Sequence, residues 1–307
     1  RRAEEGFEVT AGGAVYKARL LLNAAGTGAD RVLQMAGGGG YTILPVKGEY
    51  YLLDKEAGGT VASVIFSLPS EKGKGVLVAP TVHGNLIVGP RAVPAQSGSD
   101  TSVTAEGLAE VRRDALHLVP GLRLGSTIRS FAGLRARSTE PDFILGERPG
   151  CPGLFEMAGI KSPGLTAAPA MARAVAAAML EKLPPRPSRP QAEVYRFPRP
   201  FRAISPQEQR ALVAEDSRYG RVICRCETVT EGEIVKALKS PLTPATLGAV
   251  KRRCGAGMGR CQGGFCAPRV QAIIARERGI PLEAVRYEDS ESYILTGRSK
   301  GAAENEG

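Results

Sequence analysis

The sequence CRC at 224–226, followed after a helical stretch by CQGGFC at 261–266, decides the architecture of one end of this chain. Two pairs of thiolates on short loops predict a four-sulfur site for zinc or for an iron–sulfur cluster. The spacing favours iron and sulfide, because zinc pairs are usually Cys-x-x-Cys and often recruit histidine, whereas His83 and His117 are far away in the sequence. Buried free thiols, disulfides and zinc are the weaker alternatives.

The strings VICRCETVTEGEI (222–234) and RRCGAGMGRCQGGFCAPRV (252–270) resemble the bacterioferritin-associated-ferredoxin-type 2Fe-2S domain, in the form found at the C-terminus of certain FAD-dependent dehydrogenases. Glycines around the second pair let backbone amides approach the sulfur atoms closely. Cys254 departs from that family, which more often has threonine there, and we interpret it as a spare thiol. The resemblance implies that the metal ligands are Cys224, Cys226, Cys261 and Cys266.

Length and composition limit the classes of protein that this chain can be. Its 307 residues, 43% of them hydrophobic, suffice for one sizeable core and a small second domain. The formal charge of +10 comes from scattered arginines with only 5% aromatic residues, so we predict no nucleic-acid partner and a field that favours an anionic substrate. There is no apolar run of about eighteen residues and no leader, so we expect no transmembrane segment and a cytoplasmic protein.

The beginning of the chain predicts a hairpin and a buried strand. Apolar residues alternate on both sides of a Gly12-Gly13 turn, and an apolar run then ends at Asn23. Ala25 and Gly26 follow, ahead of a helix that starts near Ala29. Small residues at the end of a buried strand let a nucleotide cofactor approach the backbone, although they also permit tight packing alone.

A wider pattern resembles the D-amino-acid-oxidase-like flavoproteins, most closely the FAD-dependent glycerol-3-phosphate or 2-hydroxyglutarate dehydrogenases. The strings that carry it occur in the family's order: LLNAAG (21–26), ILPVKGEYYLL (43–53), GVLVAPTVHGNLIVGP (75–90), FAGLRARSTEPDFILGE (131–147) and MAGIKSPGLTAAPAMARAVA (157–176). The implied fold class is α/β (α+β). A partial Rossmann-like FAD-binding domain at 1–40 and 131–183 would hold an inserted antiparallel-sheet substrate domain at 41–130, followed by a small helical 2Fe-2S domain.

One expected motif is missing. The family begins with a strand, a Gly-x-Gly-x-x-Gly turn and a helix that bind the FAD pyrophosphate. The glycine run at 37–40 follows a helical stretch instead, so we interpret it as a flexible loop. We therefore expect an N-terminally truncated piece of a longer enzyme, inactive by itself.

Residues 41–130 predict a mostly antiparallel sheet and one helix. Short β-branched or aromatic runs separated by Gly, Pro and Asn turns predict strands at 50–53, 61–68, 76–79 and 86–88. His83 falls in one of these turns and is interpreted as a turn residue. Residues 104–118 have the pattern of an amphipathic helix, and Thr104 can cap the start of this helix.

Arg135 is the candidate substrate ligand, with Arg137 as the fallback. A guanidinium presents a planar fork that matches a carboxylate or a phosphate. The resemblance implies that the arginine of this Gly-x-Arg segment contacts the substrate anion. The alternative is an arginine that only forms a structural ion pair.

A predicted strand at 154–158 leads through a glycine-rich turn into a helix near Thr166, with Pro169 in its first turn. Glycerol-3-phosphate dehydrogenases carry a phosphate-binding lysine at the position of Gly164, so this departure argues against a phosphorylated substrate unless Lys161 substitutes. The resemblance implies that the isoalloxazine lies against Gly159, Ser162, Gly164, Leu165 and Thr166.

The composition changes after residue 183. Seven prolines between Pro184 and Pro206 predict an extended linker, which we assign to 184–220 together with a short helix at 207–217. The cluster domain is assigned to 221–285 and a tail to 286–307. Thr230 and Glu233 form a capping-box signature, and further helices are predicted at 244–253 and 268–277.

The resulting hypothesis is a dehydrogenase that oxidises a small anionic hydroxy acid, polyol phosphate or amino acid. Hydride would pass to FAD, and electrons would then leave through the 2Fe-2S centre to a redox partner subunit or another electron acceptor. A hetero-oligomer, held at the inner membrane through its partner, is consistent with this scheme. The alternatives are an electron-transfer or assembly subunit, and a zinc-binding interaction module on a degenerate flavoprotein scaffold. No residue is assigned as the catalytic base.

Overall fold

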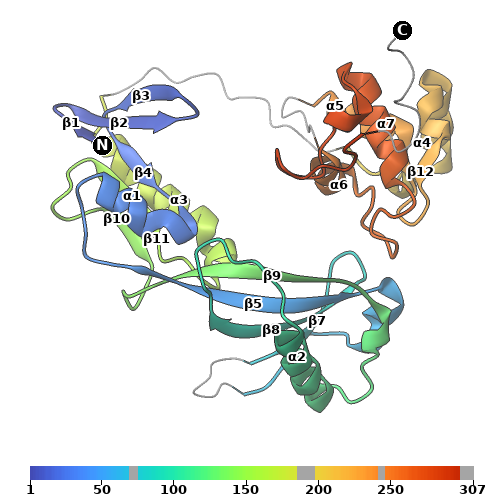
Figure 1. Cartoon of the computed structure of the whole chain (residues 1–307), viewed down its shortest axis with the longest axis horizontal. Coiled ribbons are helices and arrows are strands. Elements are labelled where there is room, and N and C mark those ends of the chain that lie inside the picture. Colours follow the sequence, from blue (N-terminus) through green and yellow to red (C-terminus); the bar gives the residue numbers. More distant parts are fainter. Residues whose placement is uncertain (69–74, 185–197, 241–245, 298–307) are drawn as a thin grey trace, which may run out of the picture. The chain divides into compact units, whose positions relative to one another are not determined.

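The computed structural model describes residues 1–68, 75–184, 198–240 and 246–297 (Figure 1). The chain divides into two units, Arg1–Gln191 and Ala192–Gly307, and each has a hydrophobic core of its own. Most of the proline-rich part of the predicted linker, and the tail beyond residue 297, lie outside the described residues.

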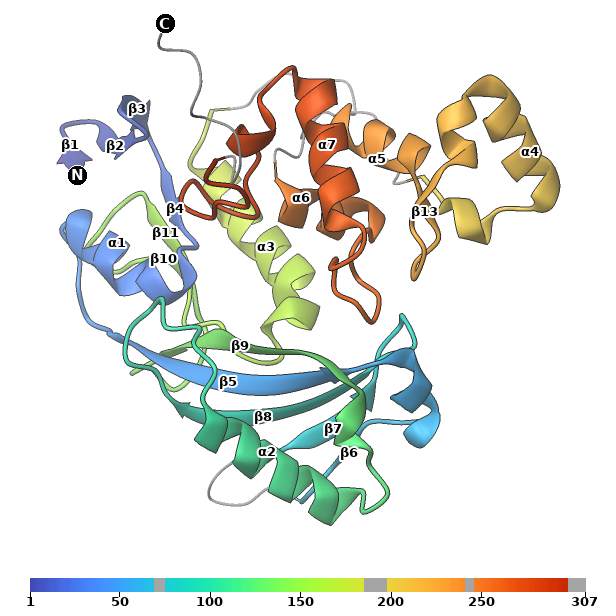
Figure 2. The ribbon, with the colours of Figure 1, turned by 45° about the vertical axis from the view of Figure 1, so that its right-hand side comes forward.

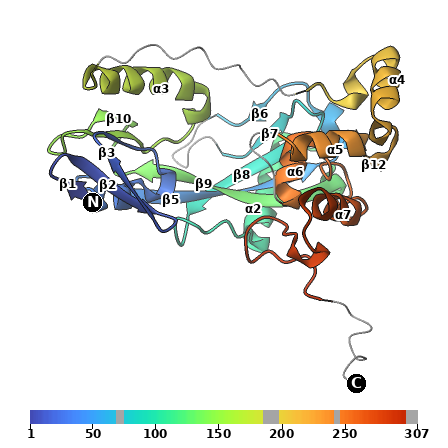
Figure 3. The same cartoon turned by 90° about the horizontal axis from the view of Figure 1, so that it is seen from above.

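The first unit contains a small mixed sheet that positions the predicted cofactor turns. Strand β4 (Leu21–Asn23) pairs in parallel with β11 (Leu154–Ala158), and β10 (Ile144–Glu147) pairs antiparallel with β11 on its other side. Helix α1 (Ala29–Met35) follows β4, and α3 (Gly164–Glu181) follows β11. Helix α3 packs against β11 and against β10, beside which it is labelled in Figure 3. The N-terminal segment forms the predicted hairpin within a separate sheet of β1 (Arg2–Ala3), β2 (Gly6–Ala11) and β3 (Ala14–Ala18).

The second sheet of this unit has five antiparallel strands, whose order across the sheet differs from their order along the chain. In spatial order they are β6 (Ile65–Phe66), β7 (Leu77–Pro80), β8 (Leu86–Pro94), β5 (Ile43–Leu53) and β9 (Thr127–Ser138). Helix α2 (Ala105–Leu118) covers one face of this sheet, as Figure 2 shows. Thr104 caps the helix, because its hydroxyl accepts a hydrogen bond from the amide of Gly107 at 3.0 Å. The predicted helix and its cap are confirmed. Strand β9 pairs with β5 up to residue 138, beyond the residue at which the predicted substrate domain ends.

Two of the predicted elements differ from the observed ones. The strand expected at 61–68 is wrong except for Ile65–Phe66, because most of the segment has no strand beside it among the described residues and Leu68 remains 90% exposed. Helix α3 begins at Gly164, two residues earlier than predicted, so Pro169 lies in the helix interior and not in its first turn.

The second unit is a set of short helices around a two-stranded ribbon of β12 (Val222–Cys224) and β13 (Val229–Thr230). The predicted capping box is confirmed: Thr230 accepts the amide of Glu233, whose carboxylate accepts the amide of Thr230. The core consists of apolar side chains from both strands and from the helices that pack on them. These helices are α5 (Glu231–Leu238), α6 (Leu247–Cys254) and α7 (Ala267–Arg278), whereas α4 (Pro206–Glu215) has no buried residue.

The residues after α7 return to this core. Val285 is fully buried, the amide of Leu247 donates to the carbonyl of Arg286 at 3.1 Å, and Ile294 packs on the core cluster. The first part of the segment that we predicted as a tail, up to residue 294, thus packs on the cluster domain.

Candidate functional site

The four predicted ligand cysteines come from two loops of the second unit. Cys224 is the last residue of β12, and Cys226 lies in the turn toward β13. Cys261 lies in the glycine-rich loop between α6 and α7, and Cys266 is the residue from which α7 starts. Because α6 ends at Gly255 in a left-handed conformation, the chain reverses and brings this loop back beside the β12 turn.

The sulfur atoms are arranged as two pairs. The Sγ atoms of Cys226 and Cys261 are 3.9 Å apart and both residues are exposed, while the thiols of Cys224 and Cys266 share a hydrogen bond and both are buried. Within the described ranges, no three His, Cys, Asp or Glu side chains are grouped so that they would hold a metal ion. The structure brings the four cysteines of the predicted ligand set together as two pairs, one exposed and one buried.

A hydrogen bond to sulfur is the largest cause of the pKa shift at Cys224, Cys261 and Cys266, whereas burial is the largest cause that raises the pKa of Cys226. The Cys266 thiol, and then the amide of Gly257 at 3.5 Å, lower the pKa of Cys224 to about 5, against the effect of burial. The amide of Phe265 is the largest cause that lowers the pKa of Cys261. The pKa of Cys266 is raised, chiefly by the hydrogen bond that its thiol shares with Cys224. Amide donors that stabilise thiolate are what a cluster of iron and sulfide requires of its ligands, so the residues fit this group.

Cys254 has the opposite environment. Burial raises the pKa of its thiol to about 11, and the thiol donates a hydrogen bond to the carbonyl of Val250 within α6 at 3.3 Å. A thiol that stays protonated packs as a small apolar group. This supports our interpretation of Cys254 as a spare thiol.

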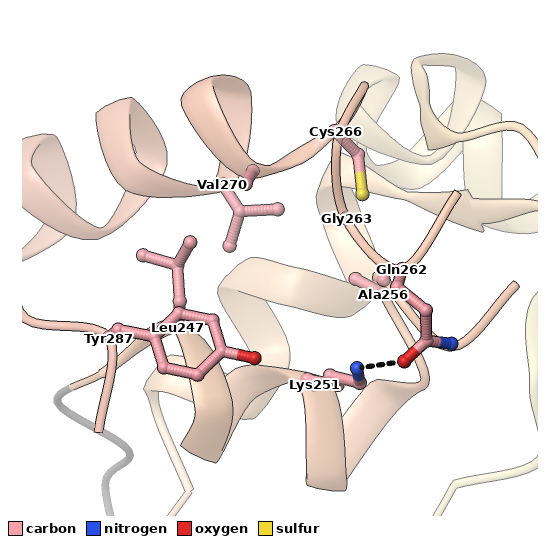
Figure 4. A pocket seen from close by; sticks show the side chains of 10 residues that line it. Leu247, Lys251, Ala256, Gln262, Gly263, Cys266, Val270 and Tyr287 are labelled. Carbon is pink, nitrogen blue, oxygen red and sulfur yellow. Dashed lines mark hydrogen bonds between the residues drawn. The ribbon is translucent and has the colours of Figure 1, made fainter. Parts of the chain in front are cut away.

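A small pocket of about 30 Å³ lies beside the buried cysteine pair, between α6 and α7 (Figure 4). Cys266 lines it, together with the buried Lys251, whose Nζ donates to Oε1 of Gln262 at 2.9 Å. Gln262 has a left-handed backbone (φ 47°) and donates from Nε2 to the carbonyls of Met258 and Gly259. Lys251 thus holds the cysteine loop to α6, a role that no sequence motif indicated.

In the first unit, the parallel pairing of β4 and β11 places their carboxyl ends at one edge of the small sheet. Ala25 and Gly26 follow β4 and are exposed, and Gly159 (φ 65°) follows β11. Ligands of open α/β sheets bind outside the carboxyl ends of parallel strands. Two of the predicted cofactor turns, which are far apart in the sequence, therefore lie at one edge.

The start of α3 is open to a ligand. Among the described residues no side chain caps this helix, and Ser162, Leu165 and Thr166 are exposed, with Leu165 at 93%. An uncapped helix N-terminus suits the anionic edge of a reduced flavin, and an exposed leucine suits the apolar ring. Gly164 is buried instead, and a Cβ atom there would lie 2.3 Å from Cγ2 of Ile160. The exposed residues Ser162, Leu165 and Thr166 fit FAD, and the close packing of Gly164 against Ile160 fixes the turn that presents them.

A buried polar network that the sequence did not reveal supports this edge. Glu156, on β11, is fully buried and accepts hydrogen bonds from Tyr41 Oη at 2.7 Å and from Asn23 Nδ2 at 3.1 Å. Asn23 also donates to the carbonyl of Ala29, and Arg148 lies 3.8 Å from the carboxylate of Glu156. The network fixes the end of β4 relative to β11. In the sequence, the only sign of this polar network was Glu156, a charged residue inside an apolar run.

Arg135 lies on the face of the five-stranded sheet opposite α2. Side chains alternate along a strand, and Tyr51 contacts α2 through its hydroxyl, so the neighbouring Tyr50 points to the other face. Arg135 Nη2 donates to Tyr50 Oη at 3.3 Å, and Tyr50 stacks on Phe131 with ring centroids 5.1 Å apart. Arg137 is exposed on the same strand. The sequence pointed to Arg135 as the candidate substrate ligand, but it did not point to Tyr50, whose hydroxyl holds the side chain of Arg135.

Residues 1–178 match the family model described as FAD dependent oxidoreductase. The chain belongs to this family. Residues 222–276 match the BFD-like [2Fe-2S] binding domain, so FAD and a 2Fe-2S cluster are the cofactors of the two parts, and the iron–sulfur interpretation is favoured over zinc. Where the described ranges form helices, none combines the length and the apolar character that a membrane crossing requires.

Several known proteins are similar to this member of the family. The glycerol 3-phosphate dehydrogenase of Caloramator mitchellensis is 43% identical over 296 residues, which are 96% of this chain and 62% of that protein. One of the subunits of the anaerobic glycerol-3-phosphate dehydrogenase of Escherichia coli K12 is 36% identical over 66 residues, 22% of this chain and 12% of that protein. The FAD-bound L-alpha-glycerophosphate oxidase of Mycoplasma pneumoniae superposes with a TM-score of 0.51 and 31% identity, covering 55% of this chain and 45% of the oxidase. The chain thus spans less than two thirds of each.

Proposed function

We propose that the complete protein oxidises glycerol 3-phosphate and passes the electrons through its 2Fe-2S centre to a separate acceptor. The observation that carries the proposal is Arg135, held by Tyr50 on the face of the five-stranded sheet opposite α2. The similarity to a glycerol 3-phosphate dehydrogenase along 96% of this chain supports the choice of substrate. When bound, FAD supplies the hydride acceptor and the cluster supplies a one-electron relay.

The chain's own residues would bind and orient the substrate. Arg135 donates one N–H to Tyr50, and a guanidinium has five N–H groups in a rigid fork, so donors remain for a phosphate. The stacking of Tyr50 on Phe131 limits the rotation of the ring that holds this fork. Preorganisation of this kind lowers the entropy lost on binding and fixes the orientation of the bound anion.

Gly164 does not argue against a phosphorylated substrate in this turn. Any side chain there would meet Ile160 at 2.3 Å, so the packing of the turn requires glycine whatever the substrate is. Lys161, three residues earlier and half-buried, carries positive charge on the same loop. Arg135 and Lys161 together are the cationic groups that we assign to the phosphate.

The experiment is an anaerobic titration of the complete protein, loaded with FAD and cluster, followed by flavin absorbance. We expect glycerol 3-phosphate to bleach the flavin, whereas glycerol, glycine and 2-hydroxyglutarate do not. Arg135→Gln removes a charged hydrogen-bonding group and should raise KM for glycerol 3-phosphate by about 30- to 100-fold. Arg137→Gln, an exposed arginine two residues along β9, is the control and should change KM less than threefold.

Bleaching by 2-hydroxyglutarate or glycine but not by glycerol 3-phosphate would refute the substrate. An equal effect of the two arginine substitutions would refute the role of Arg135. A protein in which no substrate bleaches flavin, but a chemically reduced cluster transfers electrons, would instead be the electron-transfer subunit.

In the scheme that we propose, the protein is cytoplasmic and meets the inner membrane only through its acceptor.

A further inference from the structure

We propose that Arg225, Phe265 and Arg269, together with the exposed cysteine pair, form a docking surface for an acidic redox protein, the acceptor of the cluster's electrons. This proposal rests on the proposed function only in assuming that the cluster carries electrons. We call these three residues the cluster rim. The proposal specifies the kind of partner protein, which the family matches do not specify.

The rim lies where the cysteine site meets solvent. Arg225 stands between two of the ligand cysteines in the sequence, and Phe265 directly precedes another. The guanidinium carbons of Arg225 and Arg269 lie 5.3 and 5.9 Å from the centroid of the Phe265 ring, which is 57% exposed. An exposed aromatic ring held between two arginines has the composition of an interface centre, where Phe and Arg are enriched.

The four cysteines differ in exposure, and this difference indicates which side of a bound cluster would face solvent. Cys226 and Cys261 are exposed, whereas Cys224 and Cys266 are only 2% exposed. A cluster held by these residues would have one side open to solvent, beside the rim, and one side inside the domain. Electrons that leave to a separate protein cross the shortest distance at the open side.

The charge around the site favours an acidic partner. Residues 234–276 contain no Asp or Glu, and in the described part of the chain neither Arg225 nor Arg269 forms an ion pair with a carboxylate. The carboxylates nearest to the first cysteine pair in the sequence, Glu227 and Glu231, are buried and paired with other arginines. Residues 1–184 carry 20 Lys or Arg and 17 Asp or Glu, so the flavin-family unit offers no net negative charge as a partner. The basic residues of 234–276 are Lys236, Lys239, Lys251, Arg252, Arg253, Arg260, Arg269 and Arg276.

The first test measures electron transfer out of the cluster without substrate or flavin chemistry. The complete protein, loaded with its cluster but kept free of FAD, is reduced with dithionite, freed of excess reductant, and mixed in a stopped-flow instrument with Co(EDTA)⁻ or with tris(phenanthroline)cobalt(III). Each cobalt(III) complex takes one electron from one reduced cluster and becomes cobalt(II), and no proton or covalent bond changes. We expect Co(EDTA)⁻ to react faster at low salt and to lose this advantage as salt is added.

Reversing both arginines of the rim, in the variant Arg225→Glu/Arg269→Glu, should slow the reaction with Co(EDTA)⁻ by about tenfold at low salt and accelerate the reaction with the cationic complex. Opposite changes for the two complexes separate an electrostatic effect from a change in cluster potential, which would move both rates in one direction. Arg210→Glu, an exposed arginine on α4, is the charge-matched control and should change neither rate more than twofold.

The second test measures docking alone, by isothermal titration with a plant-type ferredoxin as an acidic probe. The double reversal should weaken binding about tenfold and Arg210→Glu about twofold or less. Phe265→Ala should weaken binding without changing the rate with either cobalt complex. Equal weakening by the two charge variants, or rates with both complexes that fall together, would overturn the proposal. Slower reduction of the cluster by substrate, with unchanged oxidation by Co(EDTA)⁻, would show that the rim faces the flavin and would also overturn it.

Discussion

Replacing Gly259 by alanine should prevent this chain from holding a complete cluster. A Cβ atom at Gly259 would lie 2.1 Å from Cβ, 3.1 Å from Sγ and 3.4 Å from Cα of Cys226. Ordinary van der Waals contact begins near 3.4 Å, so the two residues must separate by about 1.3 Å. The atom in the way belongs to the stem of a ligand cysteine, close to the backbone, and no flexible side-chain end is available to move aside.

The size of the effect follows from two limits. Overpacking of this kind typically costs about 1–3 kcal/mol, and metal sites tolerate displacements of only about 0.2 Å in their ligand distances. The required displacement of about 1.3 Å exceeds this tolerance about sixfold, so Cys226 can no longer reach its position as a ligand. We therefore expect Gly259→Ala to retain less than a fifth of the iron of the unmodified protein and to lose most of its visible absorbance, while far-ultraviolet circular dichroism of the metal-free protein changes little.

Gly220→Ala is the matched control, because its Cβ would meet only Cγ1 of Val213 at 3.4 Å, and it should retain full iron content. The assay is iron and sulfide per chain after anaerobic reconstitution, with the visible spectrum of the same samples. Full iron and an unchanged spectrum in Gly259→Ala would refute the reasoning, since Cys226 would then not be a ligand whose position depends on this close approach.

Three further predictions concern stability. Lys251→Met removes the hydrogen bond to Gln262 that holds the cysteine loop, and should lower the free energy of unfolding by about 1–2 kcal/mol in guanidinium titrations that follow cluster absorbance. Glu156→Gln leaves the charge of Arg148 without its carboxylate, and should cost about 2–3 kcal/mol in urea titrations of the whole protein. Burial, and then the hydrogen bond to Glu156, raise the pKa of Tyr41, so the folded state keeps this proton longer and stability should fall as the pH rises above about 10. Tyr41→Phe should remove that part of the alkaline loss, and an unchanged pH profile would contradict the assignment.

Features that depend on short stretches of chain were predictable from the residues alone. The two cysteine pairs and the glycine loop are visible as residue types at fixed spacing, and Thr104 and Thr230 mark helix starts because a cap needs only the next turn of backbone. The hairpin at Gly12-Gly13 was predictable for the same reason, since both glycines supply the positive φ angles of the turn.

Pairing between distant segments depends on the folded chain as a whole. Arg135 meets Tyr50 across 85 residues because β9 and β5 pair in one register, and a shift by one residue would turn the arginine to the α2 face. The strand expected at 61–68 fails for the same reason: its β-branched residues favour a strand, but no described strand lies beside most of them. Whether Glu156 is buried, and which cysteines of the cluster site face solvent, likewise depends on which surfaces pack together, and local sequence does not encode that choice.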